Sequence, residues 1–264
     1  KLFSFSEVIH VSGFIGNFIV DIKRKSRYIN ENLCTACGEC ASVCPVSIPN
    51  PWDMGMAARK AIGRAFPQAI PITFNIEKKD RAPCRLTCPA GINVQGYIQL
   101  IGQKKYDRAA SLIMEKAPFP GVLGRVCPHP CEADCRRKLV DKPIAIKELK
   151  RFAADRANLE AKGLPEIIDR EEKIAVIGAG PAGLTAAYFL RLKGYQVTVF
   201  EKLPVPGGML KTGIPDYRLP SDILDKEINY ILAHGVCLVL NTAFGSEITF
   251  QGLKQDGLKA IFLS

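Results

Sequence analysis

The sequence predicts an α+β protein of several domains, with a β-hairpin and a cysteine loop first, an all-α region next, and an α/β region last. β-Branched and aromatic residues stand on both sides of a glycine-containing turn in residues 5–30, which indicates the hairpin. Apolar residues recur at three- and four-residue spacing across residues 91–159, as in amphipathic helices. From Lys173 the pattern becomes strand, glycine turn, helix and strand, which is typical of an α/β unit.

The expected domain boundaries follow these changes in pattern. A polar stretch with Gly163 and Pro165 indicates a linker over residues 161–172. The other expected parts are a hairpin segment at 1–30, a cysteine-loop region at 31–79, a helical region at 80–160 and an incomplete α/β region at 173–264. Because the chain starts without Met and stops at a strand-like LKAIFLS, we expect a segment of a longer polypeptide.

Local patterns predict several individual elements. Helices are expected in INVQGYIQLIGQ, KYDRAASLIMEKA and IAIKELKRFAADRANLE. A short helical run is also expected between the prolines of IPNPWDMGMAARKAIGRAFPQAIP, residues 48–71. Cys237, in the apolar stretch GVCLVL, is expected to be a core thiol.

The formal net charge is +10, from 36 Lys and Arg against 26 Asp and Glu. These cations are spread along the chain instead of forming one block, which argues against a nucleic-acid-binding protein. Anionic cofactors would offset part of the charge. An excess of this kind therefore favours a cofactor-binding protein.

The ten cysteines are grouped, and the chain shows no signal peptide and no apolar run of about 18 residues. Grouped cysteines without signs of export bind metal more often than they form disulfides. We therefore expect a cytoplasmic protein with no membrane span.

The first cysteine group, CTACGECASVCP, has the spacing of a bacterial ferredoxin loop. In such a loop three thiolates bind three irons of a [4Fe-4S] cluster, and the fourth cysteine ligates a second cluster. The alternative is structural zinc, which favours two separated cysteine pairs. The candidate iron ligands of this loop are Cys34, Cys37, Cys40 and Cys44.

Five further cysteines lie in CRLTCPAGINVQGYIQLI and GRVCPHPCEADC, followed by AIKELKRFAAD. These stretches resemble the helical double-cluster (alpha-helical ferredoxin) domain of the glutamate synthase small subunit. The same domain occurs in dihydropyrimidine dehydrogenase and in the large subunit of NADH-dependent ferredoxin:NADP oxidoreductase. The resemblance implies the iron ligands Cys84, Cys88, Cys127, Cys131 and Cys135.

The family has one more CxxC pair, at positions that align here with Ile76 and Lys79, which cannot bind iron. Cys84 and Cys135 are what remains of its first cluster, and Lys150 stands where a Gln or Glu often ligates the second. We hypothesise that the ferredoxin-like loop supplies the missing thiolates, so that nine cysteines complete two [4Fe-4S] clusters; three clusters are the alternative. His129 is expected either to donate a hydrogen bond to a cluster sulfur or to pack in its loop.

Residues 5–75, through VSGFIGNFIVDIKRKSRYI and GMAARKAIGRAFPQAIP, resemble the flavin-containing subunit of heterodisulfide reductase. Since the other resemblance covers about residues 80–264, we interpret the chain as a fusion of the two families.

The stretch KIAVIGAGPAGLTAAYFLRLKGYQVTVFEK carries a GxGxxG motif between a strand and a helix, as in Rossmann-like folds. Gly178 suits the tight turn, Gly180 the approach of a pyrophosphate, and Gly183 close packing of helix on strand. Pro181 suits the first helical position, and the helix N-terminus favours phosphate. Glu201, at the end of the next strand, suits ribose hydroxyls and disfavours a 2′-phosphate, so FAD or NAD is expected and NADP is not.

The next stretch, PGGMLKTGIPDYRLP, resembles the flavin-binding segment of the glutamate synthase-like family, which favours FAD. The predicted FAD-binding residues are Gly178, Ala179, Gly180, Pro181, Ala182, Gly183, Glu201, Lys202, Gly207, Gly208, Met209 and Arg218. In that family the NADPH domain follows the strand that here reads LKAIFLS, so NAD(P)H is expected to bind outside this segment.

Together the resemblances imply an FAD- and iron–sulfur-dependent NAD(P)H oxidoreductase subunit that exchanges electrons with a partner redox subunit. One version is an electron-bifurcating member of a heterodisulfide reductase-like complex, and another is a glutamate synthase small subunit-like NADPH dehydrogenase. The third is a non-catalytic electron-relay and docking module. The cofactors supply the chemistry, so no catalytic side chain is assigned.

Overall fold

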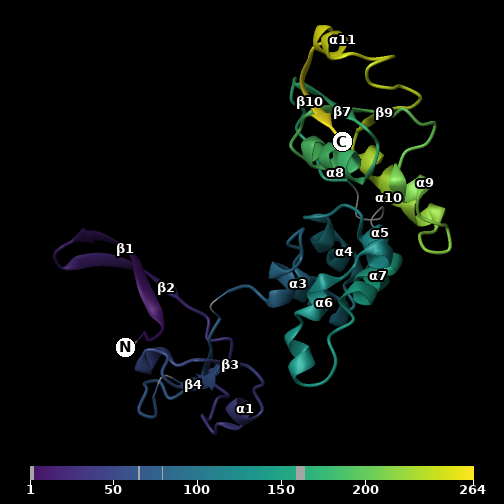
Figure 1. Cartoon of the computed structure of the whole chain (residues 1–264). Coiled ribbons are helices and arrows are strands. Elements are labelled where there is room, and N and C mark those ends of the chain that lie inside the picture. The colour runs from purple at the N-terminus through teal and green to yellow at the C-terminus, as the bar shows by residue number, and fades with distance from the viewer. Residues whose placement is uncertain (1–2, 65, 79, 159–163) are drawn as a thin grey trace. The chain divides into compact units, whose positions relative to one another are not determined.

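The computed structural model describes residues 3–64, 66–78, 80–158 and 164–264, and the chain divides into two compact units (Figure 1). Unit 1 comprises Lys1–Arg81 with Arg136–Lys142, and unit 2 comprises Ala82–Cys135 with Pro143–Ser264. None of the helices in the described residues is long and apolar enough to cross a membrane.

Unit 1 begins with an antiparallel hairpin of β1 (Ser6–Phe14) and β2 (Asn17–Arg24). Gly16 takes a positive φ of 88° in the two-residue turn between them, a conformation that suits glycine. Nearly every hairpin residue is exposed, including Phe14, Phe18 and Ile19. The hairpin projects from the rest of unit 1 (Figure 1).

The remainder of unit 1 consists of short elements. They are α1 (Glu39–Ser42), β3 (Ser47–Pro49), the 3-10 turn η1 (Pro51–Asp53), β4 (Ala58–Lys60), β5 (Ile62–Gly63) and β6 (Asn75–Ile76). The predicted helix between the prolines of residues 48–71 was wrong. Strand β4 pairs with β3 and β5 pairs with β6, and these non-local hydrogen bonds outweigh the weak propensity of so short a helix.

Unit 2 contains a helical part and an α/β part. The helical part comprises α2 (Pro83–Leu86), α3 (Val94–Gly102), α4 (Tyr106–Met114), α5 (Pro120–Val126), α6 (Pro130–Ala133) and α7 (Ile146–Arg156). The intervening 3-10 turn η2 (Arg136–Leu139) falls within the stretch assigned to unit 1. Helices α3, α4 and α7 lie where the periodicity predicts them, and their buried faces pack around Tyr97, Ile113 and Ile146. The predicted continuation of α7 toward residue 160 lies partly outside the described residues.

The α/β part is built on a four-stranded sheet with the order β10-β7-β8-β9, in which all neighbours are parallel. Its elements are β7 (Lys173–Ile177), α8 (Pro181–Leu192), β8 (Gln196–Phe200), α9 (Met209–Thr212), α10 (Ser221–Ala233), β9 (Cys237–Val239), α11 (Phe250–Gln255) and β10 (Leu258–Leu263). The predicted last strand is therefore present as β10. The core joins Val176, Val199 and Leu184.

The expectation for Cys237 was wrong, because this residue is exposed at the start of β9. Strand β9 is the last strand of the sheet order, so only one of its sides is paired within the sheet. An apolar neighbourhood in the sequence does not show which side of an edge strand faces the core.

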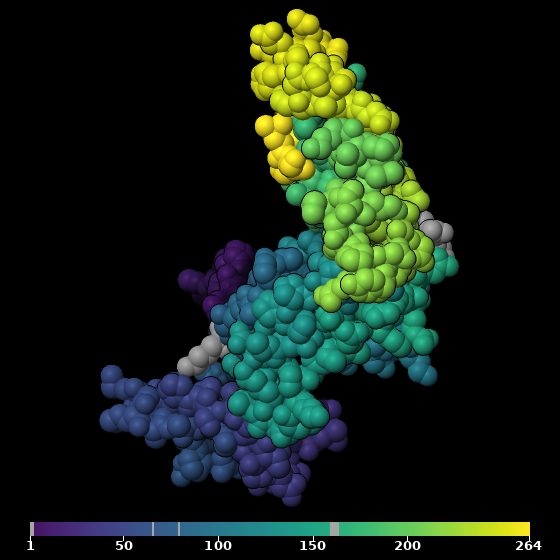
Figure 2. All heavy atoms as spheres, turned by 45° about the vertical axis from the view of Figure 1, so that its right-hand side comes forward, coloured from purple at the N-terminus to yellow at the C-terminus, as the bar shows by residue number. Residues whose placement is uncertain are grey.

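The helical and α/β parts of unit 2 pack directly on each other. Figure 2 shows the light-green atoms of the α9 and α10 region lying against the teal helical region. The contact is made by α10 and α5, and Met114, Phe119 and Val122 of the helical part belong to the same apolar cluster as the α/β core. The two parts therefore share a core.

Candidate functional site

The cysteine loop of unit 1 folds around two left-handed residues, Ala36 with φ 59° and Gly38 with φ 93°. Gly38 begins α1, which carries Cys40, while Cys34 and Cys44 lie on either side of this turn. Cys37 is exposed and the other three are half-buried. The loop thus brings four unpaired thiols into one short, tightly turned segment.

The five later cysteines lie at the ends of the short helices of unit 2. Cys84 lies in α2 and Cys88 follows it; Cys127 caps the C-terminus of α5; Cys131 lies in α6 and Cys135 follows it. Cys131 and Cys135 are each 7% exposed, whereas the other three are half-buried. All five are free thiols.

The electrostatic neighbours of these thiols divide them into two groups that share Cys88. Burial raises the pKa of Cys84, and the nearby Cys135 and Cys88 raise it further. Burial likewise raises the pKa of Cys131 to about 11, against the opposing effect of Lys150, with Cys127 and Cys88 as its thiol neighbours. Protonated thiols are poor ligands, so iron binding would have to deprotonate both.

Two further side chains, Tyr97 and Lys150, lie among these thiols or beside them. Tyr97 is fully buried, donates a 3.0 Å hydrogen bond from its hydroxyl to the Ile146 carbonyl, and has cysteines of both groups as electrostatic neighbours. Lys150, 5% exposed, lies close enough to Cys131 to lower its pKa. Lys150 is a buried cation beside the second thiol group.

The backbone N–H of His129 donates to the Cys127 sulfur at 3.4 Å. The imidazole Nδ1 lies 3.2 Å from the Cys127 carbonyl oxygen, and its Nε2 lies 3.9 Å from a Glu132 carboxylate oxygen. The sulfur contact of His129 is therefore made by the backbone, in a left-handed conformation with φ 47°.

Nowhere in the described ranges do three or more His, Cys, Asp or Glu side chains converge as ligands of a single metal ion. A cubane cluster binds each thiolate at a different iron, so its ligands need not converge on one point. Buried, grouped thiols with an adjacent cation fit an anionic cluster better than they fit an isolated zinc ion.

The glycine motif forms the expected tight turn between β7 and α8. Gly178 has φ 98°, and a Cβ on Gly183 would stand 1.9 Å from the Gly178 carbonyl oxygen, so only glycine permits this approach of helix and turn. Pro181 is the first residue of α8. Gly180 differs from both neighbours, because a Cβ there would meet no heavy atom within 4 Å.

Glu201 lies at the end of β8 and is 5% exposed. Its carboxylate accepts 2.7 Å and 2.9 Å hydrogen bonds from the backbone N–H groups of Ala179 and Leu203. The acid is therefore fixed next to the glycine turn by backbone donors.

The Gly207–Gly208 turn packs on the same loop. The Gly207 N–H donates to the Ala179 carbonyl at 2.8 Å, and a Cβ on Gly208 would stand 2.9 Å from the Gly180 Cα. The neighbouring candidates Lys202, Met209 and Arg218 are exposed. The open space at Gly180, beside an acid and a second glycine turn, fits the phosphate-binding end of a dinucleotide.

Sequence reasoning missed Glu227, which joins the two parts of unit 2. This carboxylate of α10 is 8% exposed and accepts hydrogen bonds from the Gly121 N–H at 2.5 Å and the Val122 N–H at 3.0 Å, at the start of α5. Burial raises the pKa of Glu227 to about 7, although these donors and Arg125 lower it. In the sequence it is an ordinary helical acid; only the long-range fold shows its partners.

Three family models match separate parts of the chain. Residues 27–49 match a 4Fe-4S binding domain, and residues 78–162 match dihydropyrimidine dehydrogenase domain II, 4Fe-4S cluster. Residues 176–236 match an NAD(P)-binding Rossmann-like domain. The predictions of two 4Fe-4S regions and a Rossmann-like region are thereby confirmed.

Several curated proteins are similar to the chain. It is 44% identical over 206 residues to the NADP(+)-dependent formate dehydrogenase subunit beta of Moorella thermoacetica, covering 69% of this chain and 29% of that protein. It is 42% identical over 190 residues to the NADPH-Fe(3+) oxidoreductase subunit beta of Geobacter sulfurreducens, covering 70% and 28%. It is 39% identical over 178 residues to the NAD-dependent dihydropyrimidine dehydrogenase subunit PreT of Salmonella typhimurium, covering 66% and 43%.

The chain thus spans between about three-tenths and somewhat more than two-fifths of the length of these relatives. The matched regions together contain the nine grouped cysteines and the glycine motif. The chain is therefore a homologue of iron–sulfur, NAD(P)-linked oxidoreductase subunits, with two 4Fe-4S regions and one Rossmann-like domain.

Proposed function

We propose that this chain is the electron-transfer part of an iron–sulfur flavoprotein oxidoreductase, with FAD at the glycine turn and [4Fe-4S] clusters at the grouped cysteines. Electrons pass between NAD(P)H, FAD and the clusters, to or from a partner redox subunit. The observation that carries the proposal is that the glycine-turn domain and the five-cysteine helical part share one core and one buried link, Glu227. A shared core holds the two cofactor sites in a fixed relation.

FAD is the dinucleotide that these residues favour. Glu201 is held beside the turn, where an acid accepts from ribose hydroxyls and repels a 2′-phosphate. Gly180 leaves room for a pyrophosphate, and Gly207–Gly208 closes one side of the loop. Met209 and Arg218 are proposed to contact the isoalloxazine end. A bound flavin exchanges hydride with nicotinamide and single electrons with clusters, and this is the chemistry the protein positions.

The proposed cluster ligands are the nine grouped cysteines, and Lys150 places a buried positive charge beside Cys131. An all-thiolate cubane is anionic, so a buried cation there stabilises it. Completion of a cluster by Cys44, the resemblance of residues 5–75 to heterodisulfide reductase, and electron bifurcation stay predictions.

The first experiment measures iron, acid-labile sulfide and flavin on anaerobically purified protein. We expect about eight irons per chain for two clusters, with one FAD; about twelve irons would show three clusters. Cys131→Ser should lower the iron content, while Cys237→Ser, a cysteine outside the groups, should leave it unchanged. Zinc in place of iron, without flavin, would contradict the proposal.

The dinucleotide site is tested with two glycine variants that both have open space for a Cβ. Gly180→Ala should fold normally and lose flavin, because the methyl group occupies the space proposed for the pyrophosphate. Gly102→Ala, at the end of α3, is the matched control and should keep its flavin. Full flavin content in both variants would reject this site.

A further inference from the structure

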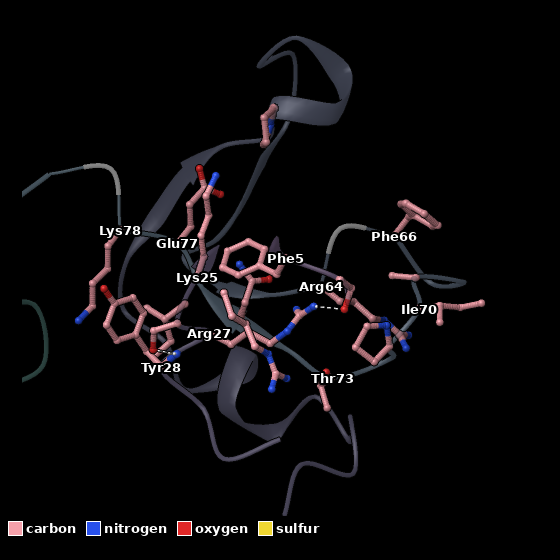
Figure 3. Close-up of a pocket in the computed structure, with 18 of the residues that line it drawn as sticks. Phe5, Lys25, Arg27, Tyr28, Arg64, Phe66, Ile70, Thr73, Glu77 and Lys78 are labelled. Atoms are coloured by element: carbon pink, nitrogen blue, oxygen red, sulfur yellow. Dashed lines mark hydrogen bonds between the residues drawn. The ribbon is translucent and has the colours of Figure 1, made fainter. Parts of the chain in front are cut away.

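Unit 1 contains a pocket of about 760 Å³ at the base of the hairpin (Figure 3). Its walls come from the chain before β1, the end of β2 and the loop that follows it, the region of η1 and β4, and the segment from Phe66 to Lys78. This volume lies in the range of small-molecule sites. No cysteine and no residue of the glycine motif lines it.

The pocket is strongly cationic. Glu77 is its one acidic lining residue. The cations around it are Lys23, Arg24, Lys25, Arg27, Arg59, Arg64 and Lys78. Such a concentration of one charge on concave walls attracts an anion.

Carboxylates neutralise only part of this charge. Arg24 pairs with Glu31, Lys25 with Glu7, and Arg59 with Glu77. Within the described part of the chain, no carboxylate lies within salt-bridge distance of Lys23, Arg64 or Lys78. An entering anion would therefore meet cations that have no competing internal partner.

Aromatic rings lie among these cations. The Arg27 guanidinium lies over the Phe5 ring at 5.0 Å, and the Lys78 ammonium lies over the Tyr28 ring at 3.6 Å. Trp52 and Phe66 meet edge to face at 6.2 Å on another part of the wall. Aromatic faces and guanidinium planes are surfaces on which a planar ring stacks.

Two buried polar groups on the wall have no hydrogen-bond partner among the described residues. They are the hydroxyl of Thr73, whose residue is 8% exposed, and the Nε–H of Arg59. Figure 3 shows Thr73 on the same wall as Arg64. Buried donors without partners cost free energy, so the position suits a ligand with acceptor oxygens.

We propose that this pocket binds a small organic phosphate with a planar ring, of the nucleotide class. The cations and the Thr73 and Arg59 donors contact the phosphate oxygens, and the aromatic side chains contact the ring. This site is separate from the glycine turn, and its occupancy does not depend on FAD binding there.

The test is calorimetric titration of the purified protein with AMP, adenosine and inorganic phosphate. The Gly180→Ala variant serves as the background, so that nucleotide bound at the glycine turn does not contribute. AMP should bind saturably and at least about tenfold more tightly than either adenosine or phosphate, because only AMP makes both kinds of contact. Equal binding of AMP and phosphate would overturn the ring contact, and no saturable binding of AMP would overturn the site.

Variants identify the pocket as the location. Thr73→Val, which keeps the shape and removes the hydroxyl, and Arg64→Gln should each weaken AMP binding about tenfold or more. Arg108→Gln on exposed α4 is the control and should bind as the background does. Unchanged binding in both pocket variants, with folding verified by circular dichroism, would place the AMP elsewhere and reject the proposal.

Discussion

At the scale of single residues, Glu227 links the α/β part to the helical part through two backbone donors of α5. Glu227→Ala removes both acceptors and leaves the buried Gly121 and Val122 N–H groups unpaired. We expect a loss of roughly 2–4 kcal/mol in the free energy of unfolding, measured by urea denaturation. Exposed Glu148→Ala is the control, and equal midpoints for the two variants would refute the link.

Glu227 also predicts a pH dependence. Burial raises its pKa to about 7 from an ordinary 4.5, so the native state binds a proton that the unfolded chain releases between these values. Its contribution to stability is full below about pH 4.5 and is lost as the pH rises through about 7. Glu227→Gln, which cannot ionise, should flatten the fall in denaturation midpoint between pH 5 and pH 8; an unchanged slope would assign that fall to other groups.

Two glycines of the turn have opposite requirements. A Cβ at Gly183 would overlap the Gly178 carbonyl, whereas a Cβ at Gly180 meets open space. We therefore expect Gly183→Ala to lower the thermal midpoint, while Gly180→Ala keeps it near the wild-type value. Differential scanning calorimetry of apoprotein tests this, since flavin does not then contribute; similar losses in both variants would be against the structure.

At the scale of elements, Tyr97 fastens α3 to the start of α7 through its bond to the Ile146 carbonyl. Tyr97→Phe keeps the ring and leaves that carbonyl without its donor, which should cost about 1–2 kcal/mol. Denaturation of the variant, with Tyr106→Phe on the same part as the control, measures the effect. A loss as large in the control would show a general sensitivity to tyrosine replacement.

The periodic helices α3, α4 and α7 could be predicted because each shows its buried face in its own sequence. The strands β4 and β5 could not, since they are two or three residues long and exist through partners elsewhere in the chain. The glycine turn and Glu201 follow a local rule and were placed from the sequence. Glu227, Tyr97 and the cationic pocket depend on residues far apart, which no local pattern reveals.

At the scale of the whole molecule, the cysteines combine stability with function. The thiols of Cys84 and Cys131 are buried and carry raised pKa values, so the apoprotein buries groups that only a cluster would use fully. Because ligand binding to the native state stabilises it, anaerobic removal of iron should lower the thermal midpoint. Reconstitution with iron and sulfide should restore it; an unchanged midpoint on removal would show that the clusters do not hold the fold.

The exposure of Cys237 on the edge strand β9 makes the chain suited to chemical counting. Alkylation of the iron-loaded protein with iodoacetamide should modify one thiol per chain if all nine grouped cysteines bind iron. It should modify two if two all-cysteine clusters leave one grouped thiol spare. Unfolding after iron removal should release all ten cysteines for the reagent, so mass spectrometry of one exposed side chain reads the ligand number of the buried ones.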